Sequence, residues 1–184
     1  IEMKFSTKIV TLEDGVKEVA VRADDGKPLL VTLKGAQVVS VDDELLLKID
    51  GETVAQCEDD VLAKAKESKM AWFGKEIADS RLESAFTSSF SLDENILSVH
   101  NAETVRLYDA KRTLLEDKEL AKDDVVDVVV QLRSVQFLQK SFETEWVLHQ
   151  AKFKAEPKPK KAVVDFSDCL FEEDPEEEEE EEFF

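Results

Sequence analysis

The chain has 184 residues, of which 42% are hydrophobic, and this is enough for one compact domain with a core plus a terminal segment. Its 43 acidic and 24 basic residues give a net charge of −19, but 12 of the acids and none of the bases lie in residues 165–184. Residues 1–164 therefore carry a net charge of only −7, so the acidity of the whole chain does not exclude a basic nucleic-acid-binding patch on this part.

The first half of the chain has the pattern of short strands separated by tight turns. Strands are predicted over residues 3–10, 16–21, 29–33, 36–41 and 44–52. The turns between them are predicted at three Asp-Gly pairs, Asp14-Gly15, Asp25-Gly26 and Asp50-Gly51. Short strands at roughly ten-residue spacing indicate an antiparallel barrel or sandwich.

The middle of the chain changes to a helical period. Residues 57–90 are expected to form two helices, the first of which ends at Gly74 as a C-cap. The second helix is expected from about Ala78 to Phe86. Strands then return, and they are predicted over residues 96–110, 125–138 and 146–153, with a turn at 140–145.

This order of elements predicts a mainly β fold: an OB-like antiparallel barrel with a helical insert and a disordered acidic C-terminal tail. A jelly-roll sandwich is left open. The expected domain covers residues 1–153, with the insert at about 58–90. A Lys/Pro linker over 154–164 and the acidic tail over 165–184 follow it.

No catalytic constellation is present in the sequence, so an enzyme is not expected. His100 and His149 lie outside metal-ligand spacings, no GxSxG motif occurs, and five glycines form no phosphate-binding loop. We therefore expect no metal and no cofactor. Cys57 and Cys169 form neither a CxxC pair nor a disulfide framework, which favours an intracellular, reducing compartment. No apolar run approaches the ~20 residues of a membrane span, so no membrane association is expected.

Two stretches alternate basic and aromatic residues, as in proteins that bind single strands by stacking on bases and contacting phosphates. Arg133, Val135 and Phe137 are expected to share one face of their strand. Many of these aromatic residues could equally be core anchors. The candidate nucleic-acid-binding residues are Lys69, Trp72, Phe73, Lys75, Arg133, Phe137, Lys140, Phe142, Trp146, Lys152 and Lys154, with Phe153 beside the last two.

The C-terminal sequence EEDPEEEEEEEFF combines an acidic run with two terminal rings. The acids imitate a phosphate backbone and the rings imitate bases, so the tail is predicted to occupy a basic groove of its own chain until DNA displaces it. Once released, it is expected to dock on partner proteins. The candidate partner-binding residues are Glu180, Glu181, Glu182, Phe183 and Phe184.

These motifs resemble those of the single-stranded DNA-binding proteins of the T-seven-phage type and of their counterparts in large eukaryotic DNA viruses. SKMAWFGKEI (68–77) resembles an S-x-x-x-W-F-G-K stretch of the viral proteins, and VQLRSVQFLQKSFETEW (130–146) resembles their late strand pair. The resemblance covers roughly residues 60–155 and the tail. Glu143 and Glu145 depart from it, because smaller or neutral residues are expected in that turn.

The resemblance implies a protein that protects single-stranded DNA in replication and recombination and whose tail contacts a polymerase, helicase or primase. It also implies a viral replication site, or the nucleus or cytoplasm of an infected cell, while a homodimer is left open. Two alternatives remain: an acidic chaperone of histones or other basic proteins, and a viral structural protein with a jelly-roll body.

Overall fold

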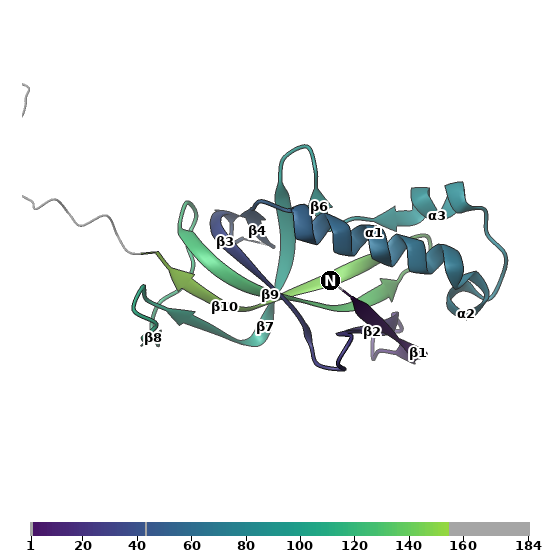
Figure 1. Cartoon of the computed structure of the whole chain (residues 1–184), viewed down its shortest axis with the longest axis horizontal. Helices are drawn as coiled ribbons and strands as arrows, with labels where there is room; N and C mark the ends of the chain where they lie inside the picture. The colour runs from purple at the N-terminus through teal and green to yellow at the C-terminus, as the bar shows by residue number, and fades with distance from the viewer. Residues whose placement is uncertain (1, 43, 155–184) are drawn as a thin grey trace, which may run out of the picture. The chain divides into compact units, whose positions relative to one another are not determined.

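The computed structural model describes residues 2–42 and 44–154, and one compact unit comprises Ile1–Phe153. Its strands are β1 (Met3–Thr11), β2 (Lys17–Ala23), β3 (Leu29–Ser40), β4 (Leu45–Lys48), β5 (Phe86–Thr87), β6 (Phe90–Ser91), β7 (Ile96–Tyr108), β8 (Leu114–Leu115), β9 (Val125–Phe137) and β10 (Phe142–Phe153). Its helices are α1 (Glu52–Glu67), α2 (Lys69–Phe73) and α3 (Asp79–Ala85). All three helices lie between β4 and β5 in the chain (Figure 1).

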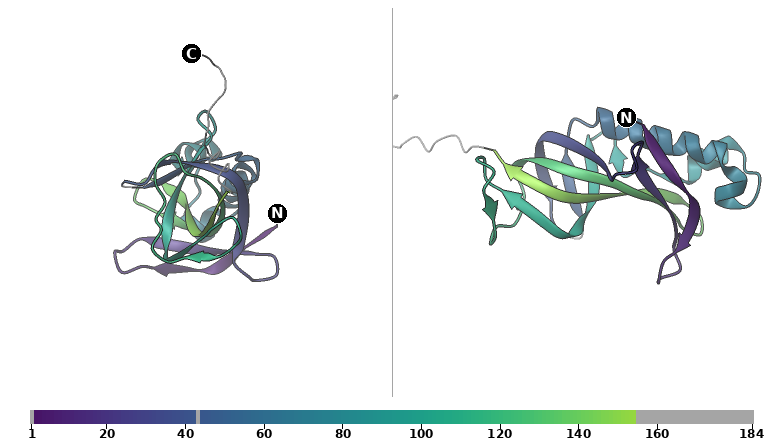
Figure 2. Two further views of the ribbon diagram at one scale, coloured as in Figure 1. Left: turned by 90° about the vertical axis from the view of Figure 1, so that its left-hand side faces the viewer. Right: turned by 60° about the horizontal axis from the view of Figure 1, so that its bottom comes forward.

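Five strands close into a barrel in the order β3-β4-β7-β10-β9, and β9 returns to β3. The left view of Figure 2 looks along this barrel. The mainly β, OB-like barrel with a helical insert is therefore confirmed, and the closed ring replaces the jelly-roll alternative. Four of the five pairings are antiparallel, whereas β7 and β10 are parallel. A closed ring with an odd number of strands cannot alternate direction throughout, so one parallel pair is required.

The β9–β10 hairpin is longer than the barrel needs, and its outer end pairs with further strands. β2 continues the sheet beside β9, with Lys17 opposite Phe137 and Ala20 opposite Ser134, and β1 pairs with β2. The predicted turn at Gly15 closes the β1–β2 hairpin, with this residue at a φ of 89° that glycine adopts without strain. These strands form a platform at the end of the barrel.

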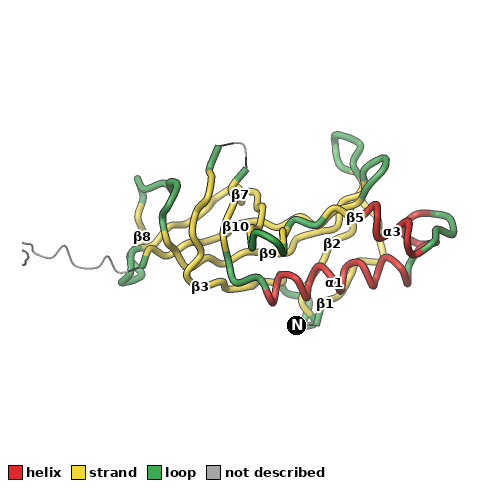
Figure 3. The backbone as a smooth tube through the Cα atoms, turned by 90° about the horizontal axis from the view of Figure 1, so that it is seen from above, coloured by secondary structure: helices red, strands yellow, loops and turns green. Residues whose placement is uncertain are grey.

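Helix α1 lies beside β10 and buries one face against the sheet (Figures 1 and 3). Its buried residues Val54, Cys57, Val61 and Ala65 follow the three- and four-residue spacing of one helix face. The helix begins at Glu52, five residues before the predicted helical stretch that starts at 57. The helical spacing of its buried residues already begins at Val54. Gly51 precedes the helix rather than closing a hairpin, and a Cβ at this position would lie 2.1 Å from the Phe90 ring.

The turn between β9 and β10 is also shorter than predicted. The Leu138 N–H donates to the Ser141 carbonyl at 2.8 Å, and pairing resumes with Phe142 opposite Phe137. Residues 142–145, predicted as turn, belong to the strand. Phe142 and Thr144 are buried and alternate with the half-buried Glu143 and Glu145, as side chains on a strand do. The predicted strands 29–33 and 36–41 are likewise one strand, β3, interrupted by a bulge near Gly35.

The predicted linker lies outside the described residues apart from Lys154, and the predicted acidic tail lies outside them entirely. Among the described residues, the helices are all too short or too polar to cross a lipid bilayer.

Candidate nucleic-acid interface

Six aromatic rings gather where α2 meets the outer end of the β9–β10 hairpin. Gly74, with a φ of 73°, ends α2 in the left-handed conformation and so fixes the direction of the chain after Trp72 and Phe73. Trp72 lies 5.5 Å from Phe137 between ring centroids, and Phe73 lies 5.5 Å from the same ring. We call this group the aromatic cluster; it consists of Phe5, Trp72, Phe73, Phe86, Phe137 and Phe142.

A cleft of about 620 Å³ opens beside this cluster. Trp72, Phe73 and Phe137 line it and are half-buried, so part of each ring reaches the surface. Three basic side chains surround the rings, and we call the site the aromatic cleft. They are Lys75 after α2, Arg81 in α3 and Lys140 in the β9–β10 turn.

The three cations of the aromatic cleft are exposed, and none has a carboxylate within 4.0 Å in the part of the chain that the structure describes. Among the described residues, Glu76 is the one acidic side chain that also lines the cleft, so the formal charge of the cleft is +2. Arg81 is not among the predicted residues, because it lies in a helix outside both stretches that alternate basic and aromatic residues. Fixed positive charge beside partly exposed rings can receive phosphates and bases together.

The structure corrects two of the predicted contact residues. Phe142 is 2% exposed and Trp146 is 1% exposed, so neither presents a ring face to a ligand. Phe142 is the inner ring of the aromatic cluster. The Trp146 indole Nε1–H donates to Glu58 Oε2 at 3.0 Å, so Trp146 is a core anchor of β10 against α1.

Two predicted cations form close ion pairs, with nitrogen–oxygen distances of 3.0 Å or less. The Lys69 ammonium lies 2.8 Å from Asp79, and this hydrogen bond is the main cause of the lowered pKa of Asp79. Arg133 donates to both oxygens of Glu145, at 3.0 and 2.8 Å. Neutralised in this way, Lys69 and Arg133 offer a phosphate less attraction than the free cations of the cleft do.

Arg133 also does not share a face with Val135 as predicted. The register of β9 against β10 shifts between Ser134 opposite Glu145 and Leu132 opposite Trp146, which leaves Arg133 as the additional residue of a bulge. The side chain of Arg133 is 53% exposed, whereas Val135 is fully buried. A bulge reverses the alternation of faces, and strand periodicity alone does not reveal it.

The last two predicted basic residues lie at the other end of β10. Lys152 is 3.8 Å from Asp127 and faces the outer surface of the barrel, while Lys154 follows the end of the strand and is exposed. The aromatic cleft therefore unites Trp72, Phe73, Lys75, Phe137 and Lys140, with Phe142 beneath them, but not the others. The partner-binding candidates at 180–184 lie outside the described residues.

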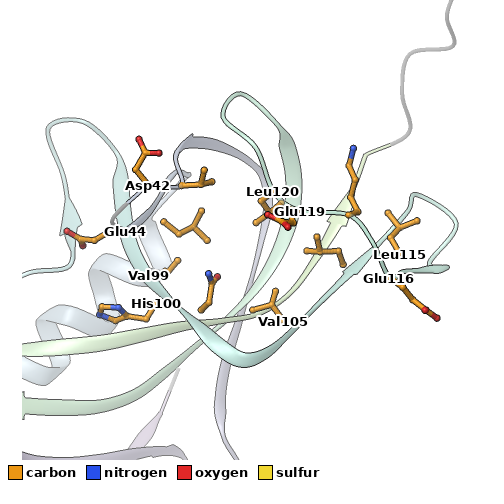
Figure 4. Close-up of a pocket in the computed structure, with 14 residues that line it drawn as sticks. Asp42, Glu44, Val99, His100, Val105, Leu115, Glu116, Glu119 and Leu120 are labelled. Atoms are coloured by element: carbon orange, nitrogen blue, oxygen red, sulfur yellow. The ribbon is translucent and has the colours of Figure 1, made fainter. Parts of the chain in front are cut away.

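A second cleft, of about 530 Å³, has the opposite charge. Asp42 and Glu44 lie on one side of it and Glu116 and Glu119 on the other, above an apolar floor that includes Val99 and other core residues (Figure 4). Lys118 is its one Lys or Arg. This acidic cleft repels a phosphate backbone, so the aromatic cleft is the candidate nucleic-acid interface.

Comparison with known proteins gives one sequence match and several structural ones. Residues 33–167 match the model described as "Family of unknown function (DUF5871)". No curated protein matches the chain in sequence. Among solved structures, the single-stranded DNA-binding protein from bacteriophage Enc34 in complex with ssDNA is 12% identical, with 85% of this chain and 95% of that chain covered and a TM-score of 0.39. Gp2.5, a single-stranded DNA-binding protein encoded by bacteriophage T7, is 11% identical, with 73% and 97% covered and a TM-score of 0.38.

Proposed function

We propose that this chain, which belongs to the family of unknown function (DUF5871), is a non-catalytic protein that binds single-stranded DNA in the aromatic cleft. The observation that carries the proposal is the convergence of Lys75, Arg81 and Lys140 on partly exposed aromatic rings. Sequence-tolerant binding of single strands needs this combination, since every base has a face that can stack and every nucleotide has a phosphate.

In this proposal the three cations contact successive phosphates, and the exposed parts of Trp72 and Phe137 receive bases. Stacking contributes about 1–3 kcal/mol per base, so two rings with three charges are sufficient for useful affinity. The Arg81 guanidinium can hold a phosphate with two parallel hydrogen bonds, whereas the two lysines act as point charges. A duplex keeps its bases stacked on one another, and the cleft should therefore prefer single strands.

The acidic tail is proposed to regulate this binding. Its 12 acids and terminal Phe-Phe pair would compete with DNA for the cleft, and covalent tethering makes such competition effective without high intrinsic affinity. When DNA displaces it, the tail would recruit replication proteins such as a polymerase, helicase or primase. The biological role we propose is protection of single-stranded intermediates in replication and recombination, at a viral replication site inside the cell.

The test is a titration of fluorescent oligo-dT and of duplex DNA with the full chain and with residues 1–164. We expect single-strand binding at about 50 mM salt that weakens steeply as salt rises, and tighter binding without the tail. Failure of residues 1–164 to bind oligo-dT at this salt concentration would refute the proposed function.

A matched pair of variants assigns the binding to the cleft. Lys75→Gln with Lys140→Gln removes two cleft charges, whereas Lys4→Gln with Lys27→Gln removes two exposed charges elsewhere. Without two of its phosphate-binding cations, the cleft variant should show a slope of log K against log salt that is lower by about 1.4, and the control pair should leave the slope unchanged. Equal effects of the two pairs would show that only net charge matters.

The acidic cleft favours a second function, binding of a basic protein segment by the acidic rim and the apolar floor (Figure 4). A chaperone of histones or other basic proteins would use this surface and also the acidic tail. Removal of residues 165–184 separates the two functions. A chaperone should lose affinity for basic proteins and gain none for DNA, while a DNA-binding protein should bind oligo-dT more tightly.

A further inference from the structure

We infer that a row of cations across the outer face of the barrel is a second contact site for the phosphates of the same bound single strand. Lys48 on β4, Lys34 on β3, Lys152 on β10 and Arg112 in the turn after β7 form this cationic row. This inference rests on the proposed function and adds a site to it, because no residue of the row lines the aromatic cleft.

The three lysines of the row lie on neighbouring or next-neighbouring strands of the barrel wall, and Arg112 follows in the turn after β7. Lys48 lies opposite Gln37 of β3, close in sequence to Lys34. Lys152 lies opposite Asp127 on one side and Tyr108 on the other. β4, β3, β9 and β10 are neighbours in the closed barrel at about 4.8 Å spacing, so the row covers about 14 Å of its curved outer wall, which is long enough for more than one phosphate of one strand.

The row also follows two hollows of the surface. One, of about 280 Å³, is lined by Lys34, Arg112 and Lys152 together with the half-buried Tyr108. The other, of about 470 Å³, is lined by Lys34 and Lys48 together with the exposed Asp50. Because Lys34 belongs to both, the hollows adjoin and form one basic track.

The charges of the row are largely available to a ligand. Lys34, Lys48 and Arg112 are exposed and have no carboxylate within 4.0 Å among residues 2–42 and 44–154. Asp127 is the acidic residue of the first hollow, and the Gly35 N–H donates to it at 2.8 Å while Lys152 lies 3.8 Å away. A body whose net charge is negative thus keeps three cations without a carboxylate partner among the described residues along two adjoining hollows of the barrel wall, which is where a polyanion would bind.

The distance between the two sites determines which ligand can reach both. Phe137 in the aromatic cleft and Asp127 in the cationic row are ten residues apart on β9, and this is about 33 Å along an extended strand. A short oligonucleotide can occupy only the cleft, whereas a long one can contact the row as well. The row should therefore contribute to affinity only above a certain oligonucleotide length.

The test compares oligo-dT of about 6 and about 30 nucleotides on the full chain, one near the lower limit and one above the upper limit of the about 4–16 nucleotides that single OB folds bind. The triple variant Lys34→Gln, Lys48→Gln, Arg112→Gln is measured beside a control with the same charge change, Lys4→Gln, Lys8→Gln, Lys27→Gln. For the long oligonucleotide, we expect the triple variant to bind more weakly and to lower the salt slope by up to about 2.1, which is about 0.7 for each phosphate that the row no longer neutralises. The short oligonucleotide should bind the triple variant, the control and the wild type alike.

Equal binding of the long oligonucleotide by the triple variant and its control would overturn the inference. So would an equal loss for the short and the long oligonucleotide in the triple variant, since the row would then not be an additional site. If neither the wild type nor residues 1–164 bind either length, the proposed function itself has failed, and this result differs from a wild type that binds both lengths but is insensitive to the row.

Discussion

Replacement of Glu58 by alanine should destabilise the fold more than any exposed substitution on the same helix. Glu58 is a charged residue of α1 that is only 4% exposed. Its carboxylate accepts hydrogen bonds from the Ser89 N–H at 3.0 Å and the Trp146 Nε1–H at 3.0 Å, as well as from the hydroxyls of Ser88 and Thr144. One side chain thus connects α1 with β10 and with the segment that leads into β6.

The magnitude follows from which donors can find another acceptor. Ser88 can donate to the Phe90 carbonyl at 2.9 Å and Thr144 can bond Ser89 Oγ, so their hydroxyls are not stranded. The Ser89 N–H and the Trp146 indole N–H lose their acceptor, and a buried donor without a partner costs about 1–3 kcal/mol. Release of a buried charge offsets part of this cost, so we expect a loss of about 2–4 kcal/mol. Glu58→Gln keeps the shape of the side chain and one of its two acceptor oxygens, so it should lose about half as much stability.

The assay is urea denaturation followed by tryptophan fluorescence, with Asp59→Ala as the matched control. Asp59 is the exposed neighbour on the same helix, and its replacement changes the net charge equally. The control should change stability by no more than about 0.5 kcal/mol. If Glu58→Ala and Asp59→Ala are equally stable, the carboxylate does not hold the barrel and helix together, and the reasoning from its four donors is refuted.

Four further outcomes are expected. Gly51→Ala should lower the free energy of unfolding by about 3 kcal/mol or more in urea denaturation, because its Cβ would overlap the buried Phe90 ring. The control Gly26→Ala, at the exposed glycine of the β2–β3 turn, should lower it by only about 1–2 kcal/mol. Equal losses would exclude a steric cause. Burial raises the pKa of the Cys57 thiol to about 11, with nearby acids adding to the effect, so in a variant whose other cysteine is serine no reaction with a thiol reagent at pH 8 is expected until denaturant is added. The pKa of this thiol is 9.0 in the unfolded chain and about 11 in the folded one, so its contribution to the stability of the fold should fall as the pH rises through that window. A contribution that increases with pH there would contradict the assigned burial. Acrylamide should quench the fluorescence of Trp72 and not that of Trp146, and oligo-dT should protect Trp72; quenching of both rings in the folded protein would contradict their assigned burial.

The sequence by itself determined the local elements and the segregation of charge. Alternating apolar residues and Asp-Gly turns predicted most strands of the barrel, because side chains on a half-buried strand face the core at every second position. The concentration of 12 acids after residue 164 is a property of the sequence alone. Part of the aromatic cleft could also be predicted from the sequence, since Trp72, Lys75 and Lys140 lie in short stretches that alternate basic and aromatic residues.

Contacts between distant elements determine which of those residues reach the surface. Trp72 and Trp146 are the same residue type in similar basic-aromatic contexts, yet only the pairing of β10 with α1 buries Trp146 against Glu58. The bulge at Arg133 and its ion pair with Glu145 depend on register, which involves two strands at once. The cationic row is made of residues up to 118 positions apart, between Lys34 and Lys152, so no sequence window contains it. Local periodicity reports the faces of one element, whereas burial, charge pairing and clefts depend on contacts between elements that are distant in the chain.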